Sequence, residues 1–87
     1  MFFVYVLRSS RDRHLYTGYT RHLRQRLEEH SQGRVSATRD RRPLKLIYYE
    51  ACLNVQDALH REKYLKTAYG KKFLKSRLMH YLAETTA

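Results

Sequence analysis

Residues 2–8, FFVYVLR, and residues 13–19, RHLYTGY, are two apolar and aromatic stretches separated by the polar residues 9–12, SSRD. β-branched and aromatic residues favour strands, and a short polar segment between two such stretches is typical of a hairpin turn. With the loop at residues 9–12, Arg8 pairs with Arg13, and Tyr5 lies directly opposite Tyr16, about 5 Å away. The sequence therefore predicts an N-terminal β-hairpin with two tyrosines on one face.

The segment after the hairpin predicts a helix and a long loop. A helix is expected from residue 21 to about residue 31, with Thr20 as its N-cap and Gly33 as its terminator. Residues 32–43, QGRVSATRDRRP, show neither a helical nor a strand period. We expect a basic loop without apolar anchors, mobile in the free protein, and a loop of about a dozen residues in a small domain is more often functional than idle.

The second half of the chain predicts one strand and two helices. Residues 44–51 form the strand, and Asn54 caps a helix with apolar residues at positions 55, 58, 59, 65 and 68. Gly70 interrupts it, residues 71–82 form the last helix, and residues 83–87 are expected to fray. The chain is thus expected to be one α+β domain over residues 1–87, in the order β-β-α-β-α-α, with helices covering a small sheet.

Composition excludes several classes of protein. The chain has 87 residues, with 18 Lys plus Arg against 8 Asp plus Glu, and a formal charge of +10. Its one cysteine, Cys52, excludes an internal disulfide framework and a multi-cysteine zinc site. The apolar run of residues 1–7 is about a third of a membrane span, and it lacks the features of a signal peptide. We therefore expect a cytoplasmic protein.

The positive charge points to a polyanionic partner, with nucleic acid first and an anionic membrane surface second. No segment gathers its cations beside a large apolar face, so we expect no membrane binding. No segment reads as a dedicated interface either, and a monomer or weak dimer is expected. The residues expected to bind nucleic acid are four loop arginines, Arg34, Arg39, Arg41 and Arg42, and three lysines, Lys66, Lys71 and Lys72.

Glu62 breaks the apolar stripe of the second long helix. A carboxylate on a core-facing stripe must be paired or bound, because isolated burial costs several kcal/mol. Two interpretations stay open: a salt bridge to one of the many arginines, or a ligand for a hard cation such as Mg²⁺. Lys66, four residues later, either reaches the same site or is the salt-bridge partner of Glu62.

Five polar positions together suit phosphodiester hydrolysis, although each alone is uninformative. Arg26 and His30 are four residues apart on a helix and point the same way. The reaction needs a metal to polarise the phosphate, a base for water and a cation for the developing charge. The set of candidate catalytic residues is Tyr5, Tyr16, Arg26, His30 and Glu62.

These residues carry a resemblance to a known family. Tyr5 and the segment Tyr16-Thr17-Gly18 are spaced like the paired motifs that name the GIY-YIG nucleases. Residues 18–27, GYTRHLRQRL, resemble the family's run into its first helix, and residues 58–62, ALHRE, its helix with the metal-binding glutamate. The resemblance covers about residues 3–80 and is closest to small stand-alone bacterial members. Two residues depart from the motif: Phe3 stands where it has Gly, and Thr17 stands where it has Ile. Both positions are expected to be structural rather than chemical.

The resemblance implies a three-stranded, mainly antiparallel sheet flanked by helices, and a one-metal DNA endonuclease. Tyr5 would orient or deprotonate the attacking water, with Tyr16 in the same cluster. Arg26 would stabilise the charge on phosphorus, and His30 would lie one helical turn later. Glu62 would be the sole protein ligand of one Mg²⁺ or Mn²⁺ ion.

The resemblance leaves the substrate open among single-stranded, branched and duplex DNA, with repair or recombination as the expected process. Two other classes of function remain. One is a non-catalytic nucleic-acid-binding module on the same fold, and the other is a scaffold whose basic face binds an acidic protein. The presence of all five polar positions favours the enzyme, because a binding module would not need to keep them together.

Overall fold

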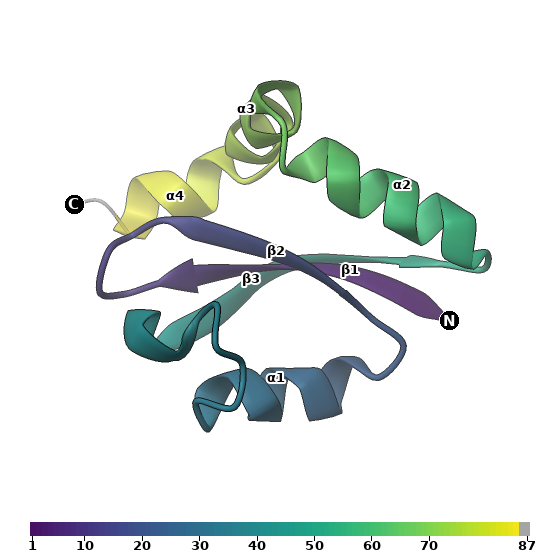
Figure 1. Ribbon diagram of the computed structural model, residues 1–87. Helices are drawn as coiled ribbons and strands as arrows, with labels where there is room; N and C mark the ends of the chain where they lie inside the picture. The colour runs from purple at the N-terminus through teal and green to yellow at the C-terminus, as the bar shows by residue number, and fades with distance from the viewer. Residues whose placement is uncertain (86–87) are drawn as a thin grey trace.

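The computed structural model describes residues 1–85 and contains a three-stranded antiparallel sheet in the order β2-β1-β3 (Figure 1). The strands are β1 (Phe2–Ser9), β2 (Leu15–Thr20) and β3 (Leu44–Cys52). The middle of the central strand β1, residues 4–7, is buried on both faces, because its alternate side chains point to opposite sides of the sheet. The predicted α+β class and element order are confirmed, with one additional short helix at the end.

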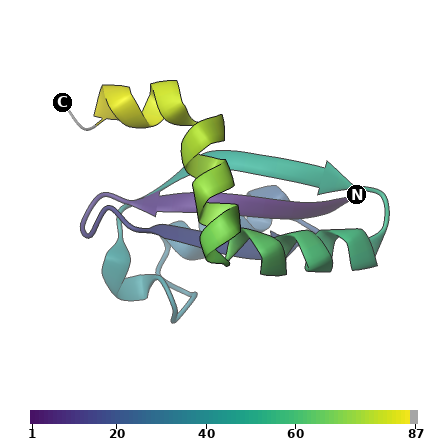
Figure 2. The ribbon, with the colours of Figure 1, turned by 90° about the horizontal axis from the view of Figure 1, so that it is seen from above.

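The helices cover both faces of the sheet. Helix α1 (Leu23–Ser31) lies on one face, and α2 (Val55–Leu65), α3 (Ala68–Arg77) and α4 (Met79–Thr85) lie on the other (Figure 1). Figure 2 shows α3 crossing above the strands, with α2 running beside the hairpin. No helix within residues 1–85 is both long enough and apolar enough to cross a membrane.

Two packed layers flank β1. On the side of α2 and α3, the buried cluster consists of Val4, Val6, Ala58, Leu65 and Leu74. On the side of α1, the fully buried side chains include two from β1, Tyr5 and Leu7, and one from the helix, His30. The second layer therefore contains polar groups where the first is aliphatic, and this difference places the chemistry on the α1 side.

The hairpin register differs by two residues from the prediction. Ser9 belongs to β1, and its N–H donates to the carbonyl of His14 at 3.1 Å. The loop is therefore residues 10–13, and Tyr5 pairs with Gly18 rather than Tyr16. Ser9 is drawn into the strand because its buried hydroxyl accepts the N–H groups of Arg11 and Asp12 in the turn. A two-residue shift keeps every side chain on its predicted face.

The helix boundaries show which capping predictions hold. Helix α1 begins at Leu23, two residues late, because the Thr20 hydroxyl accepts the N–H of His22 and caps the preceding turn. Gly33 has φ +77° and ends the helix as predicted, since glycine adopts this conformation without strain. Asn54 caps α2 as predicted by accepting the N–H of Gln56 at 2.8 Å.

The prediction that Gly70 interrupts a helix is wrong, because Gly70 lies inside α3. A Cβ at this position would overlap the carbonyl of Tyr64 and the Cα of Leu65, so glycine is needed where α3 meets the end of α2. The predicted helix 71–82 is instead two helices that are separated at Leu78. The segment expected to fray is helical to residue 85 in α4, and residues 86–87 lie outside the described part.

The basic loop over residues 32–43 is anchored, which corrects the expectation of a loop without apolar contacts. Val35 and Thr38 are buried, and residues Arg39–Arg41 form a short 3-10 helix. Arg41 forms a 2.8 Å ion pair with Asp12 of the hairpin, and the Ser9 hydroxyl donates to the Arg41 carbonyl. The loop therefore closes against the end of the hairpin and covers part of the α1 side.

Candidate active site

Tyr5 occupies the middle of the central strand, and its side chain lies under α1. The side chain is 1% exposed, and its hydroxyl lies 2.7 Å from Nε2 of His30. Its ring passes over the backbone of Gly18, the residue directly opposite on β2. A Cβ at Gly18 would overlap Cζ and the hydroxyl oxygen of Tyr5, so the missing side chain makes room for the phenol.

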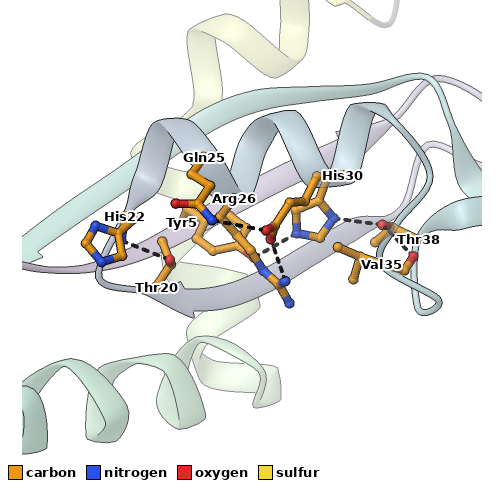
Figure 3. A network of polar contacts seen from close by, with 9 residues as sticks. Tyr5, Thr20, His22, Gln25, Arg26, His30, Val35 and Thr38 are labelled. Atoms are coloured by element: carbon orange, nitrogen blue, oxygen red, sulfur yellow. Dashed lines mark hydrogen bonds and ion pairs between the residues drawn. The ribbon is translucent and has the colours of Figure 1, made fainter.

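His30 links Tyr5 to the basic loop. Its Nδ1 lies 2.7 Å from the hydroxyl oxygen of Thr38, which is itself fully buried (Figure 3). The Thr38 hydroxyl donates to the carbonyl of Val35 at 3.5 Å, so its lone pairs are directed to His30. This arrangement favours the tautomer in which Nδ1–H donates to Thr38 and Nε2 accepts the hydrogen of the Tyr5 hydroxyl.

Tyr16 completes the aromatic cluster. Its ring centroid lies 6.4 Å from that of Tyr5 and 5.2 Å from that of His30, the second pair meeting edge to face. The predicted direct apposition of the two tyrosines is wrong, because Tyr16 pairs with Leu7. Their rings nevertheless meet along the diagonal of the hairpin, which is within reach of aromatic side chains.

Arg26 extends from α1 toward the same phenol, one helical turn before His30 (Figure 3). Its guanidinium donates to Glu29 at 2.9 Å and also interacts with the Tyr5 hydroxyl. Both interactions raise the pKa of Arg26. The side chain is 37% exposed, so the guanidinium is held in position while part of it stays accessible to an anion.

Burial and neighbouring charges set the protonation states of the Tyr5 hydroxyl and the His30 imidazole. Burial raises the pKa of Tyr5 to about 12, against a lowering by the Arg26 interaction. Burial and the nearby charge of Arg26 lower the pKa of His30 below its ordinary value. At neutral pH the phenol therefore keeps its proton, and the imidazole is neutral and able to accept one.

Glu62 approaches the site from α2, on the opposite face of the sheet. The preceding residue, Arg61, fixes α2 to β3 through two 2.9 Å hydrogen bonds to the carboxylate of Glu50. Successive helix residues are about 100° apart, so Glu62 points in a different direction from Arg61. Its negative charge makes a small contribution to the raised pKa of Tyr5, after burial and the nearby Tyr16.

The partner of Glu62 in the protein is Lys66, at 3.1 Å and one helical turn later. The salt-bridge interpretation is thus realised with a lysine rather than an arginine. The Glu62 side chain is 21% exposed and that of Lys66 is 56% exposed, so the pair is open to solvent. An exposed ammonium can be displaced at little cost, and this leaves the carboxylate available to a cation.

The chemistry of this site fits one hard cation held by a single carboxylate. Mg²⁺ commonly keeps several waters and uses one or two carboxylates together with substrate phosphates. Within residues 1–85, no group of three or more His, Cys, Asp or Glu side chains is placed to hold a metal ion. Glu62 is the predicted carboxylate that would contribute to holding such an ion.

Four of the predicted residues, Tyr5, Tyr16, Arg26 and His30, lie together, whereas Glu62 lies on α2 and is paired with Lys66. Three arginines of the basic loop, Arg39, Arg41 and Arg42, are bonded to other groups of the chain. Two sequence positions with a role in the site were missed: Gly18, which gives Tyr5 its space, and Thr38, which binds His30. The register predicted from the sequence placed Tyr16 opposite Tyr5, so the role of Gly18 could not be found from it. Thr38 carried no signal, because the loop that contains it has no period.

Comparison with known proteins gives a consistent result. Residues 1–76 match the family described as the GIY-YIG catalytic domain. A UPF0213 protein of Pediococcus pentosaceus is 45% identical over 78 residues, which cover 85% of this chain and 81% of that protein. A UPF0213 protein of Staphylococcus aureus is 39% identical over 74 residues, covering 84% and 89%. No solved structure matches the chain.

Proposed function

The chain belongs to the GIY-YIG family, a superfamily of nucleases, and on that premise we propose that it is a metal-dependent endonuclease that hydrolyses phosphodiester bonds in DNA. The observation that carries this proposal is the hydroxyl of Tyr5. It lies 2.7 Å from His30, interacts with Arg26 and is under the electrostatic influence of Glu62. One reactive oxygen thus connects the base, the cation and the carboxylate that the reaction requires.

The proton path begins at the attacking water and ends at His30. A phenol with a pKa of about 12 is a poor base unless its own proton can leave. As Tyr5 takes a proton from water, its hydroxyl proton passes to Nε2 of His30, which is neutral and 2.7 Å away. The hydroxide attacks phosphorus, the phosphorus–oxygen bond to the leaving sugar breaks, and the sugar oxygen takes a proton from solvent. His30 then returns its proton to Tyr5, which releases its own proton to solvent. Thr38 acts as a positioning residue by holding the accepting tautomer of His30.

Arg26 and Glu62 act on the phosphate rather than on the water. The guanidinium of Arg26 can offer a planar pair of donors to two phosphate oxygens as negative charge builds up. Its ion pair with Glu29 keeps it aimed at the site. Glu62 would hold the divalent ion, which when bound polarises the phosphate and neutralises charge on the leaving oxygen. Lys66 neutralises the Glu62 carboxylate while the ion is absent.

The decisive experiment is a cleavage assay on labelled single-stranded, nicked, branched and duplex DNA with and without Mg²⁺ or Mn²⁺. We expect cleavage of at least one substrate, abolished by chelator and by Glu62→Gln. Binding without cleavage of every substrate with either ion would overturn the enzymatic proposal and favour a non-catalytic binding module on this fold. Failure to bind DNA would favour an acidic protein as the partner of the basic surface.

A further inference from the structure

Three adjoining hollows lead away from the candidate active site along the hairpin. The first lies between β2 and the α2–α3 turn and is lined by Tyr16, Lys66 and Lys71. The second is lined by Lys71 together with Lys75 and Arg13. Neighbouring hollows share lining residues, and Leu15 and Lys71 line both the first and the second. The hollows therefore form a continuous surface depression, which we name the hairpin groove.

The hairpin groove ends at α4. Its third hollow shares Arg13 with the second and is completed by Arg8, Lys45 and Tyr81. The ammonium of Lys45 lies over the ring of Tyr81, 5.6 Å from its centroid. This contact holds a cation at the far end of the groove, beside the first turn of α4. The groove thus runs from the catalytic cluster past α3 to the opposite end of the hairpin.

The charged residues that line the hairpin groove are mostly basic, although one of them, Lys66, is ion-paired with Glu62. Six basic side chains line it, Arg8, Arg13, Lys45, Lys66, Lys71 and Lys75. The single acidic residue in the lining, Asp12, forms a 2.8 Å ion pair with Arg41, and that hydrogen bond lowers its pKa to about 2. A row of cations with a neutralised carboxylate is the electrostatic footprint of a polyanion backbone.

Arg13 provides a second, independent indication. Its φ is +62°, in the left-handed region that favours glycine and asparagine, and it is the one non-glycine residue within 1–85 with a positive φ. The turn would therefore be relaxed by a glycine. An arginine instead occupies the position where the second and third hollows meet, and strained backbone is characteristic of functional sites.

The arginines of the basic loop are committed differently. Arg41 is paired with Asp12, Arg39 donates to the carbonyl of Gly33, and Arg42 donates to the carbonyls of Arg39 and Ser31. These bonds hold the loop against α1 and the hairpin. The structure thus has two cationic surfaces. The arginines of the basic loop form hydrogen bonds and an ion pair within the protein, whereas the cations of the hairpin groove follow a groove that begins at the catalytic cluster.

We propose that the hairpin groove binds the sugar-phosphate backbone of a DNA strand on one side of the cleaved bond, with Arg13 as its central phosphate contact. The direction of the strand rests on the proposed function, because the catalytic cluster defines where the groove begins. Binding itself does not depend on catalysis. It can therefore be measured in the presence of chelator, where the enzyme is silent.

The test compares two variants that each lose three positive charges. The groove variant is Arg13→Gln/Lys71→Gln/Lys75→Gln, and the loop variant is Arg34→Gln/Arg39→Gln/Arg42→Gln. Each is titrated against a short fluorescein-labelled oligodeoxythymidylate in chelator over a series of salt concentrations. If the three groove residues each contact one phosphate, the slope of log Kd against log salt should fall by about 2 in the groove variant. The loop variant should retain most of the parental slope.

A single substitution separates binding from folding. Arg13→Gly removes the charge and relieves the left-handed strain, so the melting temperature should stay the same or rise while the affinity falls about threefold or more. An unchanged salt slope in the groove variant, or an equal or larger loss in the loop variant, would overturn the proposal. Absence of cleavage by the parent with intact groove binding would refute the nuclease function alone.

Discussion

Gly18 lies directly opposite Tyr5 in the hairpin, and the phenol ring of Tyr5 occupies the space that a side chain at position 18 would fill. This pairing explains how a tyrosine from the central strand reaches the edge of the sheet. Because β2 is an edge strand, the hydroxyl that crosses it contacts His30 of α1 at 2.7 Å and is influenced by the charge of Glu62 on α2. Groups from opposite faces of the sheet can therefore act on one oxygen.

Gly18→Ala should disable cleavage by displacing Tyr5. The added methyl group would overlap the ring and hydroxyl of Tyr5, and overpacking of this kind costs about 1–3 kcal/mol. We expect kcat to fall at least about tenfold and the melting temperature to drop, while DNA affinity in chelator stays near the parental value. Wild-type kcat in this variant would show that the position of the Tyr5 ring is unimportant to the reaction.

Glu62→Gln should abolish cleavage and leave folding almost unchanged. Its partner Lys66 is 56% exposed, so loss of the ion pair should cost no more than about 1 kcal/mol. DNA binding in chelator should be equal to or stronger than that of the parent, because a negative charge is removed. Lys66→Gln is the matched control for the ion pair and should retain kcat at saturating DNA, although its DNA affinity should fall because Lys66 lines the hairpin groove. Cleavage by Glu62→Gln within about tenfold of the parent would refute the metal-ligand role.

Tyr5→Phe should reduce kcat far more than Tyr64→Phe, although both changes remove one hydroxyl and keep the ring. Only Tyr5 can pass a proton to His30. Tyr48→Phe is a second control with a different signature. The Tyr48 hydroxyl donates to Glu50 at 2.8 Å, so this variant should lose about 1 kcal/mol of stability and no activity. Similar small effects on kcat at all three positions would reduce Tyr5 to a packing residue.

Arg26→Lys should be severely impaired even though the charge is kept. A lysine cannot reproduce the planar fork, and losing one phosphate hydrogen bond in the transition state costs about 2–4 kcal/mol. Arg24→Lys, on an exposed part of the same helix, is the matched control and should be nearly silent. The measurement is kcat for both variants on one DNA substrate at one Mg²⁺ concentration. Comparable rates would remove Arg26 from the active site.

Acidification should destabilise the protein through His30. Burial and the charge of Arg26 lower its pKa in the folded state, so the unfolded chain, with a pKa of about 6.5, takes up a proton first as pH falls. The free energy of unfolding should therefore be level above about pH 7.5 and decline below about pH 6.5. Urea unfolding over this range should show a weaker dependence in His30→Gln. An identical slope in the variant would assign the titration to another group.

The elements themselves were predictable because they depend on local chemistry. The aromatic stretch 2–8, the cap at Asn54 and the terminator at Gly33 determine their own conformations through propensity and hydrogen bonds to near neighbours. Periodicity also placed Glu62 on the buried stripe of α2, where its side chain is 21% exposed. The sequence by itself thus determined the order of elements, the faces of the strands and the identity of five polar candidates.

Tertiary structure decided everything that depends on contacts between distant segments. The register was set by Ser9, whose buried hydroxyl accepts hydrogen bonds from two N–H groups of the turn. This register placed Gly18 rather than Tyr16 opposite Tyr5. Thr38 became the partner of His30 because a loop without periodicity folded onto α1, and Arg13 joined Lys71 because the hairpin passes beside α3. Such contacts carry no local signature, since their energy arises only when packing excludes water from groups that are far apart in the chain.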